Sequence, residues 1–195
     1  MVRPVFAVAS SNVYVPTFYF FILQHITMAN MVYFMYPARS ASYHVFVLPT
    51  VITSIDMEAM VNTVTAWVEN PVKFARSHGI AGSHPYEQQE DDEIQILILE
   101  GFLLYNHKPL AEMCSRRYYL TIPYEECKLR RSGRNYRVPD PPGLFDGHVW
   151  PMYLKHRQEM EDQGVAFVSI DGLLSKDDIF NQVYTDVCNK ILNIS

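Results

Sequence analysis

The sequence predicts an α/β domain with a mostly parallel sheet and flanking helices. Apolar runs of strand length at 94–101, 117–123 and 165–172 alternate with segments of helical spacing. Hydrophobic residues make up 49% of the 195 residues, enough to bury one core. The chain divides at a composition boundary near residue 50 into an N-terminal segment, 1–50, and an α/β domain, 51–195.

The N-terminal segment is atypical because it is apolar and almost uncharged. No Asp, Glu, Lys or Arg lies between Arg3 and Arg39, and the first acidic residue is Asp56. Runs at 4–9 and 44–48 have the composition of strands. The run 15–37 has the length of a membrane span. The polar and helix-breaking residues within it disfavour that alternative: Pro16, Gln24, His25 and Asn30.

The elements of the α/β domain follow in order. Apolar residues between Met57 and Val68 recur every three or four positions and predict a helix that ends before Pro71. A polar loop at 82–93 precedes the unbroken apolar run 94–101, which suits a parallel strand covered on both faces. After the strand at 117–123 we expect a helix over 123–133. After the strand at 165–172, Ser175 and Asp178 form a capping box for the last helix.

Charge and cysteine content exclude several functional classes. The net charge of −5 and a pI near 5.8 give no general attraction to nucleic acid or to anionic membranes. Three cysteines without metal-ligand spacing indicate a reduced, cytoplasmic protein without disulfides or structural zinc: Cys114, Cys127 and Cys188.

One carboxylate follows a predicted strand directly. Glu100 ends the run 94–101 and precedes Gly101, at the edge of a parallel sheet where ligands bind. Two interpretations carry equal weight, a catalytic carboxylate and a loop or helix-capping carboxylate.

A basic cluster begins within the predicted helix 123–133 and continues beyond it. Its members are Lys128, Arg130, Arg131, Arg134 and Arg137. Basic residues complement the C-terminal end of a helix, and Gly133 is a candidate C′ glycine. Four arginines exceed what a cap needs, and guanidinium groups match phosphate oxygens, so we favour phosphate binding. The stiff run VPDPPG after the cluster suits a flap over a ligand.

Several segments resemble the nicotinamide riboside kinase family, from about residue 51 to the C-terminus. They are LEGFLLYNHKPL, LTIPYEECKLRRSGRNY and VPDPPGLFDGHVWPMYLKHRQEM, with DMEAMVNTVTAWVENPVKFARSHG most similar to the muscle form. The resemblance implies a P-loop NTPase-like fold related to uridine kinases. It also implies transfer of the γ-phosphate of ATP, with Mg²⁺, to nicotinamide riboside in NAD synthesis, with nicotinic acid riboside as a second acceptor.

The resemblance assigns roles to individual residues. Residues 128–146 match the family's lid, and Glu100 matches a carboxylate close to metal and water. The positions that match ATP contacts are Arg130, Arg134, Tyr136, Leu174, Ser175 and Lys176, and those on the substrate side are Arg131, Tyr136 and Arg137. Three further residues of the last matching segment are expected to be structural: Asp146, His148 and Trp150.

The N-terminal segment departs from the family pattern. The family's phosphate loop needs glycines and a lysine, but the first glycine is Gly79 and the first lysine is Lys73. The family's catalytic and metal-binding aspartate has no counterpart, and Pro49 and Thr50 stand at the positions of its ribose-binding pair. We therefore expect ATP and nicotinamide riboside to bind weakly or not at all, and we expect low stability because central strands of the sheet are lost.

Two explanations of this departure remain open. One is a variant or imperfectly assembled product of a kinase gene that lacks a working active site. The other is a non-catalytic interaction protein on a kinase scaffold, since the muscle form is also known as an integrin-binding protein. A membrane-anchored regulator ranks last, because it depends only on residues 15–37.

Overall fold

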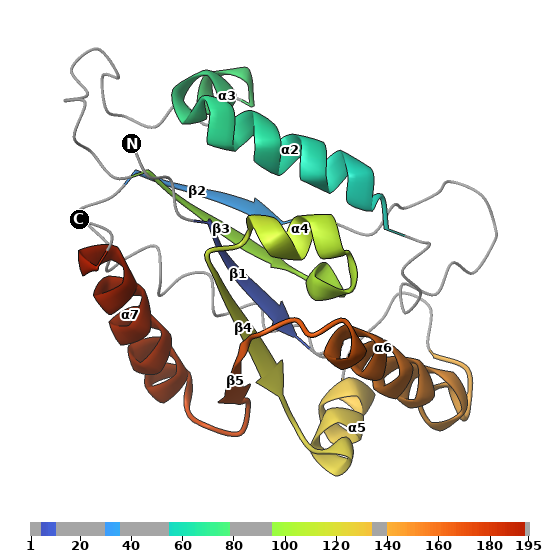
Figure 1. Cartoon of the computed structure of the whole chain (residues 1–195). Helices are drawn as coiled ribbons and strands as arrows, with labels where there is room; N and C mark the ends of the chain where they lie inside the picture. The colour runs from blue at the N-terminus through green and yellow to red at the C-terminus, as the bar shows by residue number, and fades with distance from the viewer. Residues whose placement is uncertain (1–4, 11–29, 36–54, 79–94, 134–139, 194–195) are drawn as a thin grey trace.

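The computed structural model describes residues 5–10, 30–35, 55–78, 95–133 and 140–193. Its centre is a five-stranded sheet in the order β2-β3-β1-β4-β5, and every pair of neighbouring strands is parallel (Figure 1). The predicted α/β fold class is therefore confirmed. The strands are β1 (Val5–Ser10), β2 (Asn30–Met35), β3 (Gln95–Gly101), β4 (Arg116–Thr121) and β5 (Val168–Asp171).

Helices cover both faces of the sheet. On one face, α2, α4 and α6 pack over Val5, Leu97 and Tyr119. On the other face, α7 packs over Phe6, Ile98 and neighbouring side chains (Figure 1). The helices are α2 (Met57–Glu69), α3 (Pro71–Ser77), α4 (Lys108–Met113), α5 (Tyr124–Ser132), α6 (Trp150–Asp162) and α7 (Lys176–Leu192), with a 3-10 turn at Leu104–Asn106 and a π-helical turn at Phe145–Val149.

This double covering explains the unbroken apolar run of β3. Successive side chains of a strand point to opposite faces, so Ile96 and Ile98 enter the core below α7 while Leu97 and Leu99 enter the other core. All four are at most 9% exposed. A parallel strand with two covered faces needs apolar residues at every position, as the sequence analysis predicted.

The N-terminal segment contributes the middle strand. In β1, Val5 and Ala7 face one core and Phe6 faces the other, and all three are at most 2% exposed. The strand pairs with β3 on one side and with β4 on the other. We expected low stability because the sheet would lack its central strands. That reason was wrong, because β1 supplies the central pairing.

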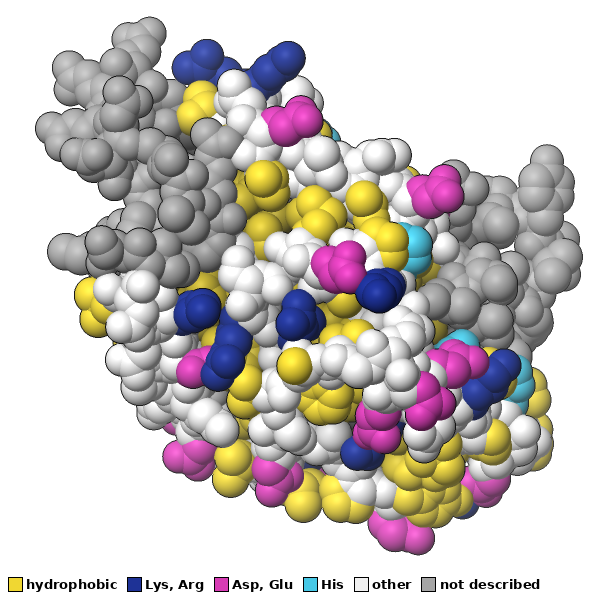
Figure 2. Space-filling view, in the orientation of Figure 1, with side chains coloured by type: hydrophobic (Ala, Val, Ile, Leu, Met, Phe, Trp, Pro, Cys, Tyr) yellow, Lys and Arg dark blue, Asp and Glu magenta, His cyan; other side chains and the backbone are white. Residues whose placement is uncertain are grey.

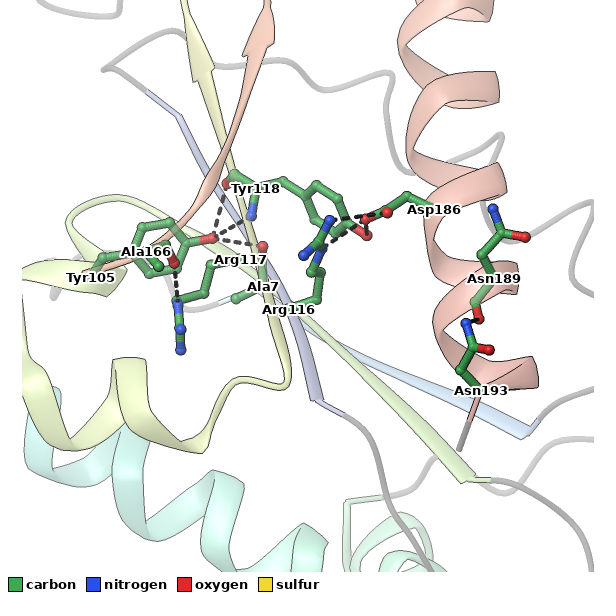
Figure 3. A network of polar contacts seen from close by, with 9 residues as sticks. All are labelled: Ala7, Tyr105, Arg116, Arg117, Tyr118, Ala166, Asp186, Asn189 and Asn193. Carbon is green, nitrogen blue, oxygen red and sulfur yellow. Dashed lines mark hydrogen bonds and ion pairs between the residues drawn. The ribbon is translucent and has the colours of Figure 1, made fainter. Parts of the chain in front are cut away.

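Buried polar contacts hold the middle strands and α7 in place. The Tyr105 hydroxyl lies 2.6 Å from the Ala7 carbonyl oxygen in β1, and it also accepts a hydrogen bond from the Tyr118 amide in β4 at 3.1 Å (Figure 3). On the opposite face, Asp186 of α7 accepts two hydrogen bonds from Arg116 and one from the Tyr118 hydroxyl. A side chain from each layer is thus bonded to β4.

Most predicted elements are present, and three of the sequence predictions differ in detail from the structure. The strand predicted over 165–172 is shorter, Val168–Asp171. Pro71 ends α2 as predicted but also begins α3, because Asn70 caps that helix by accepting from the Lys73 amide. Gly133 closes α5 with φ −79°, not in the left-handed conformation of a C′ glycine. The predicted strand at 44–48 and the loop at 82–93 lie outside the described residues.

Candidate functional site

The carboxyl ends of the parallel strands meet at one edge of the sheet. In the register of the sheet, Val8 of β1 lies beside Glu100 of β3, and Thr121 of β4 lies beside Asp171 of β5. Ligands of open parallel sheets bind outside this edge. The described loops and helix termini at this edge are therefore the place to test the predicted site residues.

Glu100 lies where the sequence predicted it. It is half-buried near the end of β3, and the next residue, Gly101, lies close to the turn that follows the strand. A Cβ atom on Gly101 would lie 2.9 Å from Leu104 Cδ2, so the chain turns tightly after the carboxylate. The position suits a carboxylate that faces a ligand at the edge of the sheet, and its catalytic role remains a prediction.

The basic residues of α5 are each paired with a carboxylate. Arg130 Nε donates to Glu126 at 2.5 Å and Arg131 Nε donates to Asp140 at 2.8 Å. The Arg131 side chain is 16% exposed and that of Arg130 is 36% exposed. Arg131, the more buried of the two, is thus paired with Asp140, which lies beyond the end of the helix. An anionic ligand of Arg131 would compete with Asp140.

Lys128 has a different environment one turn earlier. Its ammonium group donates to Asp146 at 2.8 Å and to the Tyr124 hydroxyl at 3.1 Å. The hydrogen bond with Asp146 is the main cause that raises the pKa of Lys128, and the same bond lowers the pKa of Asp146. The Tyr124 hydroxyl also donates to Asp146. These contacts fix the start of α5 to the π-helical turn.

Aromatic packing strengthens this junction. The ring of Trp150 lies 5.1 Å from that of Tyr124 and 4.9 Å from that of Tyr153, between centroids. Phe145 packs against both Tyr124 and Trp150. These contacts support the structural roles expected of Asp146 and Trp150. Sequence reasoning missed Tyr124, whose only signal is its position in the first turn of a predicted helix.

The predicted adenine-side residues lie at the start of α7. Ser175 is the N-cap: its hydroxyl oxygen accepts from the Asp178 amide at 3.1 Å and its hydroxyl donates to the Asp178 carboxylate at 2.6 Å, so the two residues of the predicted capping box pair at the start of the helix. Leu174 is 43% exposed beside it, and Lys176 is exposed. Gly172, just before them, admits no side chain because a Cβ would lie 2.5 Å from Ile122 Cγ2. The loop therefore lies close against the end of β4.

The structure does not describe every predicted site residue. Arg134, Tyr136 and Arg137 lie outside the described residues. Within the ranges that the structure describes, no group of three or more His, Cys, Asp or Glu side chains could hold a metal ion. Mg²⁺ that arrives with a nucleotide takes most of its ligands from phosphate and water, and Glu100 is a candidate for the protein's share.

The described residues form no large patch of positive charge on the face drawn in Figure 2. Lysine and arginine side chains are interspersed there with aspartate and glutamate among the described residues. No helix in the described part of the chain is long and apolar enough to cross a membrane.

Together, the parallel sheet, its two helical layers and the basic helix beyond the carboxyl edge define an α/β protein of the predicted class. Comparison with known proteins gives the family. The chain is 59% identical over 145 residues to human nicotinamide riboside kinase 2, covering 74% of this chain and 61% of that protein. It belongs to the nicotinamide riboside kinase family.

Other relatives agree with this assignment. Mouse nicotinamide riboside kinase 2 is 54% identical over 145 residues and covered to 72%, and human nicotinamide riboside kinase 1 is 50% identical over 141 residues and covered to 67%. A solved structure of a possible uridine kinase from Bacillus stearothermophilus matches 88% of the chain and 90% of its own, with 14% identity and a TM-score of 0.47. No family model matches the chain.

Proposed function

We propose that this chain is a ribosylnicotinamide kinase of low turnover. The reaction transfers the γ-phosphate of ATP to the 5′-hydroxyl of nicotinamide riboside, with nicotinic acid riboside as a second acceptor. The hydroxyl oxygen forms the new bond to phosphorus, the bond to the ADP oxygen breaks, and the hydroxyl proton is released. The identity of 59% over 145 residues with human nicotinamide riboside kinase 2 carries this proposal.

The proposed roles follow the resemblance of these segments to the family. Glu100 at the end of β3 would contact Mg²⁺-bound water, and Mg²⁺ would neutralise phosphate charge when it arrives with ATP. The basic residues of α5 would stabilise the charge that develops on the transferred group. ATP would contact Arg130, Arg134, Tyr136, Leu174, Ser175 and Lys176, and the riboside would contact Arg131, Tyr136 and Arg137.

Low turnover follows from the composition of the N-terminal segment. A phosphate loop uses glycine backbone amides and a lysine, and the first 72 residues contain neither glycine nor lysine. Losing one preorganised donor to a transition state lowers kcat by about 10²–10³-fold. We expect a rate at least about a hundredfold below that of a kinase with a phosphate loop.

The test is product formation by the purified full chain. Nicotinamide mononucleotide is followed by mass with Mg²⁺, ATP and nicotinamide riboside, and Arg131→Ala is compared with Arg76→Ala, a substitution of an exposed arginine on α3. We expect slow product that disappears in Arg131→Ala and persists in Arg76→Ala. Product that is equal in both variants would come from a contaminating kinase and would contradict the proposal.

The second candidate is a non-catalytic interaction protein on the same scaffold, with an integrin as the specific partner. Its sequence basis is the missing phosphate loop. Folded protein that forms no product would favour this candidate over a slow kinase. A cytoplasmic location suits either function, since Cys114, Cys127 and Cys188 are free thiols.

A further inference from the structure

A small cavity lies between the turn that follows Glu100 and helix α6. Its volume is about 10 Å³, and residues 102–106, Tyr119 of β4 and one side of α6 line it. In Figure 1, α6 lies beside the turn that precedes α4. The cavity therefore joins the segment after the candidate catalytic carboxylate to the helix that follows the predicted lid.

One wall of the cavity holds a buried histidine with an unused nitrogen. His156 is 4% exposed, and its Nδ1 lies 2.7 Å from Glu159 Oε2. A carboxylate only accepts, so Nδ1 carries a proton, and in the neutral ring Nε2 presents a lone pair. Within the described residues, Nε2 is buried and has no hydrogen-bond partner. A buried acceptor without a donor is unfavourable, so a donor is expected at this position.

Other polar groups surround the same space. Tyr119 and Tyr153 line the cavity. Burial is the main cause that raises the pKa of the Tyr119 hydroxyl, and interaction with Tyr153 is the second. Arg157 Nη1 donates to the Tyr153 hydroxyl at 3.5 Å. These three residues and His156 line the cavity and carry polar side-chain groups, and among these groups Nε2 of His156 is a buried atom without a hydrogen-bond partner in the described part of the chain.

The turn on the opposite wall has an uncommon backbone conformation. Leu103 has φ +58°, the left-handed region that a branched side chain rarely adopts. The side-chain amide nitrogen Nδ2 of Asn106 donates to the His156 carbonyl oxygen at 2.7 Å and ties this turn to α6. Such a conformation persists only where surrounding contacts determine it.

We propose that the cavity is a binding site for one buried water molecule, which donates a hydrogen bond to His156 Nε2 and links α6 to the turn after Glu100. A volume of about 10 Å³ is close to the minimum for one water and excludes a larger ligand. His156 then helps to hold the turn after Glu100 against α6. This inference does not depend on the proposed reaction.

Nitrogen-15 NMR of the labelled full chain tests the state of His156. We expect a protonated Nδ1 and an unprotonated Nε2 whose shift shows that it accepts a hydrogen bond. A protonated Nε2, or an Nε2 shift typical of a nitrogen without a hydrogen bond, would overturn the proposal. This measurement uses the unmodified protein and needs no variant to fold.

Oxygen-17 relaxation dispersion, which detects long-lived internal waters, tests the ligand itself. We expect His156→Phe to lose the contribution of a single water, while His156→Gln retains it because the amide can still accept. Gln158→Ala, on the exposed side of α6, is the matched control and should equal the unmodified protein. Equal amplitudes for His156→Phe and the unmodified protein would overturn the proposal.

Discussion

Replacing Tyr105 by Phe should measure how firmly the N-terminal strand is bound into the sheet. The hydroxyl is buried, lies 2.6 Å from the Ala7 oxygen and 2.9 Å from the Tyr118 oxygen, and accepts from the Tyr118 amide. The substitution removes one donated and one accepted hydrogen bond, each with a net worth of about 1 kcal/mol, and leaves buried backbone groups less well satisfied. We expect a loss of about 2–3 kcal/mol in the free energy of unfolding.

Urea denaturation followed by circular dichroism provides the assay. With a slope of about 2–3 kcal/mol per molar urea, the transition midpoint should fall by about 1 M. Tyr184→Phe, on a partly exposed position of α7, removes a hydroxyl without breaking a strand contact and should change stability by less than about 0.5 kcal/mol. A Tyr105→Phe midpoint equal to that of Tyr184→Phe would refute the packing of β1 described above.

Three further predictions concern charge and thiol chemistry. Asp140→Asn should raise pyrophosphate affinity about two- to fivefold in low-salt calorimetry, because it removes the carboxylate that competes for Arg131; unchanged or weaker binding would contradict this. Burial alone would raise the pKa of Asp186, but its hydrogen bonds with Arg116 and Tyr118 lower it. Ionised Asp186 therefore stabilises the fold at neutral pH. This contribution should be lost progressively as the pH falls below about 4, the ordinary pKa of an aspartate, and through the lowered pKa of the folded protein. Asp186→Asn should therefore cost about 1–2 kcal/mol at pH 7 and little at low pH, measured by urea denaturation at each pH. Burial raises the pKa of the Cys114 thiol to about 12, so iodoacetamide at pH 7.5 should modify Cys188 first; faster labelling of Cys114 would show that this region opens.

Elements with a local signal were predicted well. The apolar run of β3 and the capping box of α7 depend on neighbouring residues, and both are present. Strand β2 was missed because Asn30–Met35 lies inside a long uncharged run, and its strand conformation depends on pairing with β3, about 65 positions away in sequence. Helix α3 was missed because Pro71 was interpreted only as a stop signal.

The sequence predicted which charged residues lie at the candidate site, but it did not predict which of them form ion pairs. The position of Glu100 followed from the strand pattern, and the basic residues of α5 followed from composition. Their carboxylate partners did not, because Asp140 and Asp146 reach α5 only through the turn and π-helix beyond it. Residue spacing within one helix gives no information about contacts with a later segment.

The central structural claim is that Val5–Ser10, which lies in a segment with neither glycine nor lysine, supplies the middle strand of the sheet. Hydrogen exchange followed by mass spectrometry measures this directly. Peptides that cover β1 should exchange as slowly as those that cover β4, since β1 is hydrogen-bonded to a strand on each side. Complete exchange of β1 within seconds, with β4 still protected, would contradict the account and leave the N-terminal segment outside the folded core.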